Sequence, residues 1–179
     1  MTLSLVIDTA TARTIVGLVR AGEVLFEEFH EGATDHGRAV ADLVARALRV
    51  EANPDQVIVG MGPGPFTGLR VGIAYARTFA LAREIPLLGI CSLDAIDIDS
   101  YEYTVAIDAR RKEIYWARYS NRVRVEGPAV SSPADVTDFI IDQYPSVKRL
   151  VQLSAQQNET EPFYLRRPDA VPTAERGNP

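Results

Sequence analysis

The chain has 179 residues, and its 24 Asp and Glu outnumber its 19 Lys and Arg, for a formal net charge of −5. This charge argues against an extended nucleic-acid surface, because phosphate contacts need clustered Lys and Arg. The single cysteine, Cys91, excludes an intrachain disulfide, and the sequence shows neither a cationic leader nor an apolar run of membrane-spanning length. We therefore expect a cytoplasmic protein of one or two small lobes with no membrane contact.

The chain opens with a predicted β-meander followed by a helix. Short apolar or alternating runs predict strands at residues 3–7, 14–20 and 23–30, with a turn at Ala21 and Gly22. A helix follows to about residue 49, capped by Thr34 or Asp35, and its apolar face includes Val40 and Leu43.

A glycine- and proline-rich loop joins the next strand to a second helix. The apolar run at 57–59 predicts a buried strand, and GMGPGPFTGLRVG follows at Gly60–Gly72. Proline deletes amide donors and glycine permits unusual backbone angles, so neither strand nor helix continues through this loop. We interpret it as a structural elbow rather than a phosphate cradle, although its position before a helix would suit an anion. The structural residues of the loop are Gly62, Gly64, Thr67 as helix cap, and Gly68.

The helix expected from about residue 68 to 84 is apolar on two faces. Small residues recur at every fourth position on one side, and only a narrow polar seam remains. We hypothesise that a partner subunit covers the stripe; the alternative is that another segment of this chain covers it. The predicted interface consists of Leu69, Arg70, Gly72, Ile73, Ala76 and Ala80, with Val40 and Leu43 from the preceding helix.

The second half of the chain repeats the opening pattern. An acidic stretch at 92–102 is expected to cross between lobes, and then Val105–Ala109 echoes Leu5–Thr9 at an offset of one hundred residues. Further strands are expected at 113–119, 122–125 and 147–153, with a helix after Ser132. We expect an N-terminal lobe at 1–98, a compact C-terminal lobe at 99–165 and a loose tail at 166–179.

The repeated strand that ends in Asp is typical of the α/β, actin-like ATPase (ASKHA) fold, in which two duplicated lobes each carry a mixed sheet and flanking helices. Asp8 and Asp108 occupy the places that face metal and phosphate in ATPases of this fold. The turns after them lack the glycine that lets backbone amides approach a phosphate closely. We therefore expect no ATP hydrolysis and no bound cofactor.

Other catalytic signals are weak. His30 and His36 do not have the spacing of a zinc pair on one helical face, so we expect no metal. Cys91 follows an apolar strand and has no nearby histidine, which favours a core residue over a nucleophile. The basic run at 110–112 is interpreted as a solvated turn, with RNA contact as the alternative.

Four motifs together resemble the bacterial TsaB family, also called YeaZ. They are GPGPFTGLRVG at Gly62–Gly72, VIDTAT at Val6–Thr11, DARRKEIYWARY at Asp108–Tyr119 and YLRRPDAV at Tyr164–Val171. The first and third motifs are specific to the family. The four motifs together span both lobes and the C-terminal part of the chain.

The resemblance implies a noncatalytic protein of the actin-like fold. It implies pairing with the paralogue TsaD and, with the ATPase TsaE, support of N6-threonylcarbamoyladenosine formation next to the anticodon of tRNA. It also implies pairing through the helices of the N-terminal lobe, and the second apolar helix face predicts a homodimer when the protein is alone. Contact with tRNA is expected only through the complex.

Two departures and two alternative functions accompany this resemblance. The second lobe looks compact for the family, which puts contacts of that lobe with tRNA or TsaE in doubt, and Pro65 stands where the family usually has Ser. The alternatives are an independent ATP-dependent enzyme of the same fold and a glycoprotease-like peptidase, which would need metal ligands.

Overall fold

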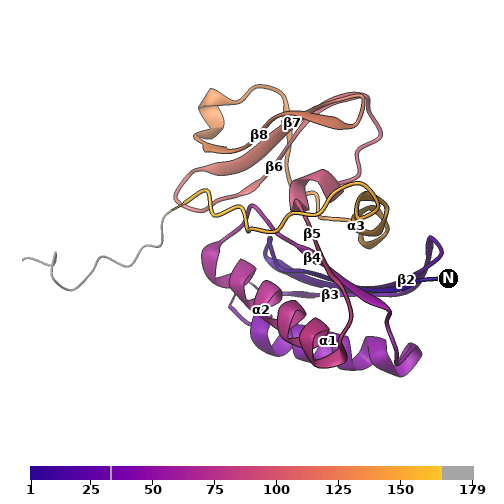
Figure 1. The fold of residues 1–179 in the computed structure, drawn as a ribbon. Helices are drawn as coiled ribbons and strands as arrows, with labels where there is room; N and C mark the ends of the chain where they lie inside the picture. Colours follow the sequence, from indigo (N-terminus) through magenta and orange to yellow (C-terminus); the bar gives the residue numbers. More distant parts are fainter. Residues whose placement is uncertain (33, 167–179) are drawn as a thin grey trace, which may run out of the picture.

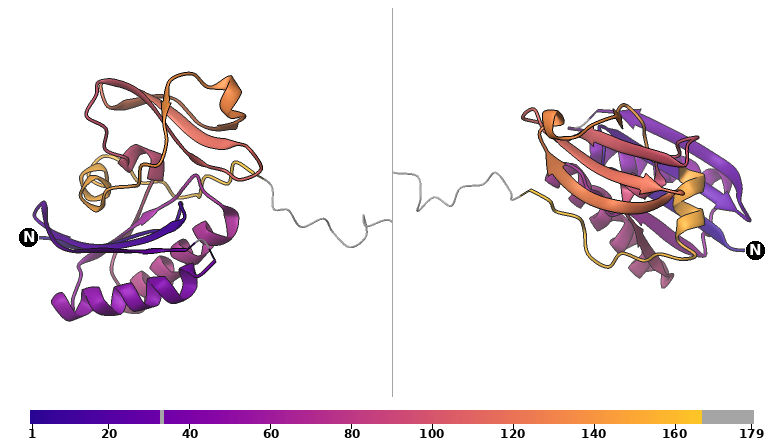
Figure 2. Two further views of the ribbon diagram at one scale, coloured as in Figure 1. Left: turned by 180° about the vertical axis from the view of Figure 1, so that it is seen from behind. Right: turned by 90° about the horizontal axis from the view of Figure 1, so that it is seen from above.

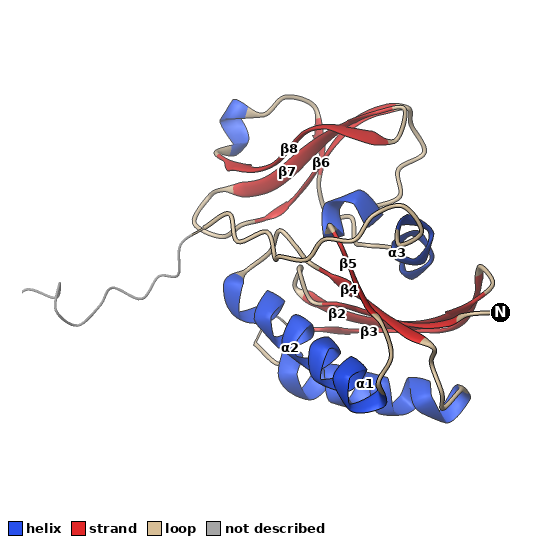
Figure 3. Ribbon diagram, viewed as in Figure 1, coloured by secondary structure: helices blue, strands red, loops and turns tan. Residues whose placement is uncertain are grey.

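A computed structural model describes residues 1–32 and 34–166. These residues form two mixed β-sheets stacked one above the other, with two long helices beneath the lower sheet (Figure 1). Figure 3 shows that the upper sheet carries little helix of its own.

The first sheet has the strand order β3-β2-β1-β4-β5. Strand β1 pairs antiparallel with β2 and parallel with β4, and β4 pairs parallel with β5. Every residue of β1 is buried, as expected for a central strand covered on both faces. The strands are β1 (Leu3–Asp8), β2 (Arg13–Arg20), β3 (Glu23–Glu31), β4 (Gln56–Gly60) and β5 (Leu87–Ile90).

Helices cover both faces of this sheet. The long helices α1 (His36–Val50) and α2 (Phe66–Arg83) lie side by side on one face, where they share an apolar core with β1, β2 and β4. The short helix α3 (Val147–Leu153) lies on the other face, between the two sheets (Figure 2). The first sheet is therefore the middle layer of a sandwich of helices.

The second sheet repeats the beginning of the first. Its order is β8-β7-β6-β9, and β6 pairs antiparallel with β7 and parallel with β9, as β1 does with β2 and β4. This correspondence confirms the duplicated actin-like arrangement and the two mixed sheets. Its strands are β6 (Glu102–Asp108), β7 (Ile114–Ser120), β8 (Val123–Ser131) and β9 (Phe139–Ile140), and its links include the 3₁₀ turns η1 (Ser92–Ala95) and η2 (Pro133–Asp135).

Two elements of the second half differ from the sequence-based prediction. The expected strand at 147–153 is helix α3, because Ser146 caps it by accepting from the amide of Arg149 and because Val147 and Leu150 are buried one turn apart. The expected helix after Ser132 is only the turn η2, followed by β9. The expected helix on the second sheet is therefore not formed, and α3 packs on the first sheet.

The helix caps also differ from the prediction. Asp35 is the N-cap residue of α1, but its side chain makes no capping hydrogen bond. Helix α2 begins at Phe66 after Pro65, so Thr67 lies in the first turn, exposed, and is not the cap. Proline before the first turn fixes φ, and the elbow therefore starts this helix without a side-chain cap.

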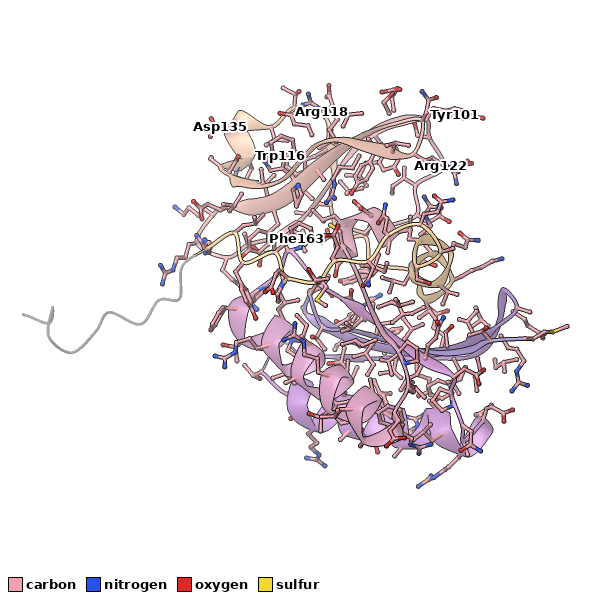
Figure 4. All side chains as sticks on the ribbon, in the orientation of Figure 1. Tyr101, Trp116, Arg118, Arg122, Asp135 and Phe163 are labelled. Carbon is pink, nitrogen blue, oxygen red and sulfur yellow. The ribbon has the colours of Figure 1, made fainter. Side chains whose placement is uncertain are left out.

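The segment after α3 ties the two sheets together. The amide of Glu159 donates to Gly89 at 2.7 Å, and the amide of Phe163 donates to Met61 at 2.9 Å. Phe163 packs against apolar residues of both lobes and lies between them in Figure 4. Arg166 donates to the carbonyl of Ala109 at 2.8 Å. The rest of the tail expected at 166–179 lies outside the described residues.

Candidate functional site

The stripe of small residues predicted as a partner interface is buried inside the chain. On α2 the side of the helix that faces the first sheet is made of Gly68, Leu69, Gly72, Ile73, Ala76 and Ala80, and on α1 Val40 and Leu43 belong to the same core. Leu69 and Ala76 are fully inaccessible, so they have no surface to offer a partner. The interface prediction is wrong for these residues, and only Arg70 of the predicted set lies exposed.

Close approach of α2 to the end of β1 explains the small residues. A Cβ atom at Gly72 would lie 2.2 Å from the hydroxyl oxygen of Thr9, and one at Gly68 would lie 3.0 Å from the His36 ring. The Thr9 hydroxyl donates to the carbonyl of Gly68 at 2.8 Å, which fixes the helix in this position. The stripe is thus covered by the chain itself, as the alternative interpretation held.

The opposite face of α2 is uncovered. Leu81 is 80% exposed, and Ala74, Thr78 and Ala82 are also exposed, whereas Val71 and Tyr75 are half-buried. Helix α1 adds Gly37, Ala41 and Ala45, which are exposed and share one side of that helix. We call this surface the α1–α2 face: Gly37, Ala41, Ala45, Val71, Ala74, Tyr75, Thr78, Leu81 and Ala82.

None of the residues of the α1–α2 face carries a charge. A Cβ atom at Gly37 would lie 4.0 Å from Val71, so the two helices meet along this side. No other described segment lies beneath them in Figures 1 and 2. The rings of Tyr75 and Phe79 stack with centroids 6.5 Å apart, and partial burial raises the pKa of Tyr75. Small side chains of this kind let another helix approach closely.

Charged residues border this face. The guanidinium of Arg70 lies 5.1 Å from the centre of the Phe66 ring, and Arg77 donates to the carbonyl of Thr160 at 3.4 Å. On the far side of α1, Arg46 forms an ion pair with Glu28. An uncharged centre with a charged rim is the usual composition of a protein interface.

The elbow loop packs against the end of β1. Gly62 and Gly64 are buried, and a Cβ atom at Gly64 would lie 2.4 Å from the carbonyl oxygen of Ala10. The φ angle of Gly62 is +85°, which a residue with a side chain rarely adopts. These contacts favour the structural elbow over a phosphate cradle.

Asp8 is completely buried at the junction of the two lobes. One carboxylate oxygen accepts from the amide of Ala10 at 2.9 Å, and the other accepts from the Ser92 hydroxyl at 2.6 Å. Burial raises the pKa of Asp8 to about 6, and the two hydrogen bonds oppose the shift. A Cβ atom at Gly60 would lie 1.8 Å from the Asp8 carboxylate, so glycine is required there. Both carboxylate oxygens of Asp8 are therefore engaged in hydrogen bonds within the chain.

Asp108, the counterpart of Asp8 in the second lobe, is exposed. It accepts from the amide of Arg110 at 2.9 Å and borders a cavity of about 240 Å³ between the lobes. Thr11 and Pro65 of the first lobe line the same cavity. The structure therefore does not bring Asp8 and Asp108 to one open site.

The surroundings of the two histidines and of the cysteine favour structural roles over catalytic ones. His36 is buried, its Nδ1 lies 2.8 Å from the Thr14 hydroxyl, and burial lowers its pKa. His30 lies 3.8 Å from Asp35 at the surface. Burial raises the pKa of the Cys91 thiol to about 12, which is unsuited to a nucleophile. Within residues 1–32 and 34–166, no group of three or more potential ligands could hold a metal ion.

Ser92, the hydrogen-bond partner of Asp8, is not among the site residues predicted from the sequence. A signal lay in the apolar runs that form β1, β4 and β5, because the carboxyl ends of parallel strands meet at one edge. Asp8 is the last residue of β1, and Ser92 lies two residues after the end of β5. No comparable signal pointed to Asp94, whose hydrogen-bond partner Tyr119 comes from the second sheet.

Comparison with known proteins supports the family resemblance. Residues 30–170 match the family model described as TsaD: tRNA N6-adenosine threonylcarbamoyltransferase. An uncharacterized protein of Mycobacterium tuberculosis (strain ATCC 25618 / H37Rv) is 39% identical, with 95% of this chain and 94% of that protein covered. The tRNA threonylcarbamoyladenosine biosynthesis protein TsaB of Escherichia coli is 33% identical over 64% of this chain, and the match spans 54% of that relative.

Solved structures support the fold. YeaZ from Pseudomonas aeruginosa superimposes with a TM-score of 0.74 at 21% identity, covering 87% of this chain and 91% of that one. A second Pseudomonas aeruginosa protein, described by its similarity to peptidase YeaZ, gives 0.79, also at 21% identity, covering 93% of this chain and 100% of that one. Among the described residues, none of the helices combines the length and the apolar character needed to cross a membrane.

The close packing at Gly72 generates a stability prediction. Gly72→Val should lower the free energy of unfolding by about 1–3 kcal/mol, because the added atoms clash with Thr9. Ala74→Val, two positions along the helix and exposed, is the control and should cost less than about 1 kcal/mol. Urea unfolding of both variants measures the difference, and equal costs would contradict the packing described for this helix.

Asp8 should make the stability depend on pH. Its pKa is raised in the folded state, from 3.8 to about 6, so the folded protein binds its proton more tightly than the unfolded chain does. The stabilisation that this proton gives is greatest below pH 4, declines as the pH rises to about 6 and is constant above. Over this range the free energy of unfolding should fall by on the order of 3 kcal/mol.

The measurement compares the wild-type protein with Asp8→Asn by urea unfolding between pH 4.5 and 7. The variant has no titrating group at this position, so the wild type should lose stability relative to it as the pH rises. Parallel pH profiles would show that Asp8 does not titrate in this range.

Proposed function

Because the chain belongs to the TsaB/YeaZ family and carries the TsaD-type domain, we propose that it is a noncatalytic subunit that binds and activates a TsaD-type paralogue. The reaction served is the N6-threonylcarbamoyladenosine modification of tRNA next to the anticodon. The observation that carries the proposal is the uncovered α1–α2 face, which lies on the two helices of the first lobe.

The α1–α2 face has the shape and composition that a helical partner requires. Small residues such as Ala41, Ala45 and Ala74 allow close approach, and Leu81 offers a large apolar side chain to the partner. Exposed apolar residues gathered on one uncharged surface are typical of a binding site. The interface is therefore assigned to this face, in place of the buried stripe on the other side of α2.

The surroundings of Asp8 support a noncatalytic role. Both of its oxygens already accept hydrogen bonds, and Gly60 and Ser92 fill the space beside it. A metal ion or a phosphate at this position would have to displace these contacts. The catalytic groups are therefore expected on the paralogue.

The remaining assignments of the proposal concern assembly. The TsaE ATPase joins the pair, tRNA is contacted only through the complex, and the complex acts in the cytoplasm. In the absence of the paralogue, two copies of this chain associate through the α1–α2 face, because that surface remains apolar.

A charge in the middle of the α1–α2 face should prevent assembly. Ala74→Arg is exposed in the isolated chain, so it should leave folding intact and weaken binding to the TsaD-type paralogue of the same organism more than about tenfold. Affinity capture of the paralogue, followed by tRNA modification by the reconstituted proteins, provides the measurement.

Ala134→Arg is the matched control. It makes the same chemical change at an exposed position of the second lobe and should leave binding unchanged. Wild-type affinity in Ala74→Arg would refute the assigned interface, and equal losses in both variants would show that the loss is not specific to the α1–α2 face.

Calorimetry with Mg-ATP tests the noncatalytic assignment directly. The isolated chain should show no ATP turnover, because Asp8 is enclosed and both of its oxygens are engaged. Saturable ATP binding with phosphate release by this chain alone would favour the alternative, an independent ATP-dependent enzyme.

A further inference from the structure

The basic turn between β6 and β7 lies outside the α1–α2 face. Its residues Arg110, Arg111 and Lys112 are all exposed. Their φ angles are +63°, +55° and +63°, the longest run of left-handed residues with side chains among the described residues. Glycine or asparagine adopts such a backbone at lower cost, so the turn itself does not require three cations. Their presence calls for another reason.

Hydrogen bonds hold this turn in place. The Asp108 carboxylate accepts from the amide of Arg110 at 2.9 Å, and the amide of Ala109 donates to the carbonyl of Glu113 at 2.9 Å. Arg166 donates to the carbonyl of Ala109 at 2.8 Å and forms an ion pair with Glu113. The turn therefore presents its cations from a braced backbone, with a further cation at its base.

Two aromatic rings connect the basic turn to the start of helix α2. Tyr164, close to Arg166 in the sequence, is 42% exposed, and its ring centre lies 5.0 Å from that of Phe66. The guanidinium of Arg70 lies 5.1 Å from the centre of the Phe66 ring. Figure 1 shows the turn and the start of α2 on the same side of the molecule. We call this surface the basic–aromatic strip: Phe66, Arg70, Arg110, Arg111, Lys112, Tyr164 and Arg166.

The charge of the strip is opposite to that of the whole chain. The chain has a formal net charge of −5, yet the cations of the strip outnumber the acidic residues beside it, Asp108, Glu113 and Asp142. Arg70 and Lys112 form no ion pair with the described residues. Exposed ion pairs contribute little in water, so the pairing of Arg110 with Asp108 is easily exchanged. The strip therefore offers cations to a polyanion.

We propose that the basic–aromatic strip binds the single-stranded anticodon loop of tRNA when the chain is part of the complex. The inference rests on the proposed function, in which tRNA is contacted through the complex, and it assigns the part of that contact that falls on this chain. Arg110 and Lys112 pair with phosphates of the loop, and the ring of Tyr164 stacks on an unpaired base.

The combination of cations with exposed rings favours an RNA loop over an acidic protein segment. Carboxylates would pair with the cations alone, whereas a loop offers phosphates to the cations and unstacked bases to the rings. A duplex keeps its bases stacked inside and offers mainly phosphates. The strip also reaches Arg70, which borders the α1–α2 face. An RNA loop on the strip would therefore lie beside the paralogue, which carries the catalytic groups in the proposed function.

Fluorescence anisotropy with labelled RNA tests the proposal on the reconstituted complex of this chain and its TsaD-type paralogue. The probes are an unmodified transcript of the substrate tRNA, its anticodon stem-loop and an RNA duplex without a loop. The double variant Arg110→Gln, Lys112→Gln should bind the first two probes about tenfold more weakly. The slope of log affinity against log salt concentration should fall by about 1.4, because two phosphate contacts are lost.

The matched control is the double variant Arg118→Gln, Lys148→Gln. It removes the same charge at exposed positions outside the strip and should leave both the affinity and the salt dependence unchanged. An equal loss in the control would show a general effect of charge and would overturn the proposal.

Substitution of Tyr164 tests the stacking of a base. Tyr164→Ala should weaken binding of the stem-loop about tenfold, whereas Tyr164→Phe keeps the ring and should bind like the wild type. Neither substitution should change the binding of the duplex. If Tyr164→Ala does not fold, the double variant on the exposed turn still decides the question.

Affinity capture of the paralogue separates this inference from the proposed function. The strip variants should capture the paralogue as the wild type does, because their substitutions lie outside the α1–α2 face. Intact capture with unchanged RNA affinity and salt dependence in the double variant Arg110→Gln, Lys112→Gln would overturn this inference alone. Loss of capture in that variant would show that the turn binds protein, and would also overturn it. Failure of the wild-type chain to capture the paralogue would contradict the proposed function and, with it, this inference.

Discussion

The carboxyl end of β1 is the point on which the rest of this structure depends. Three elements approach it so closely that side chains are excluded: β4 at Gly60, the elbow at Gly64 and helix α2 at Gly72. Asp8, Ala10 and Thr9 fill the space beside Gly60, Gly64 and Gly72 respectively. The hydrogen bonds of Asp8 and Thr9 reach η1 and α2. The orientation of α2, and hence the surface it presents to solvent, follows from this packing.

The two apolar faces of α2 have different physical roles. The inner face is small because the backbone must lie close to Thr9, and burial there contributes to the core of the first lobe. The outer face has no such requirement from the fold, yet it is uncharged from Val71 to Ala82 apart from Arg77 at its border. Folding alone does not explain an uncharged outer face on an exposed helix, and the proposed binding function would account for it.

Local patterns predicted most of the fold, and long-range contacts account for what they missed. The strands of both sheets, except β9 at Phe139–Ile140, and the duplication followed from short apolar runs and from the echo of residues 5–9 at residues 105–109. The helix at 147–153 was mistaken for a strand because its seven residues are too few for a clear period, and its apolar side chains pack against β2, more than one hundred residues earlier. For α2, the helical periodicity showed two apolar faces but not which of them packs on the sheet. That choice depends on Thr9 and His36, which periodicity cannot position.

The enclosed Asp8 and the open α1–α2 face are two consequences of one arrangement. In a duplicated fold with an Asp at the end of each first strand, an open cleft would leave both carboxylates accessible from the space between the lobes. Here the Ser92 hydroxyl and the Ala10 amide donate hydrogen bonds to the Asp8 carboxylate. The segment at 158–166 crosses between the sheets and forms hydrogen bonds with Gly89, Met61 and Ala109. A chain braced in this way is poorly suited to the lobe closure that accompanies nucleotide chemistry. It is suited to presenting one helical surface to another subunit, as the proposed function requires.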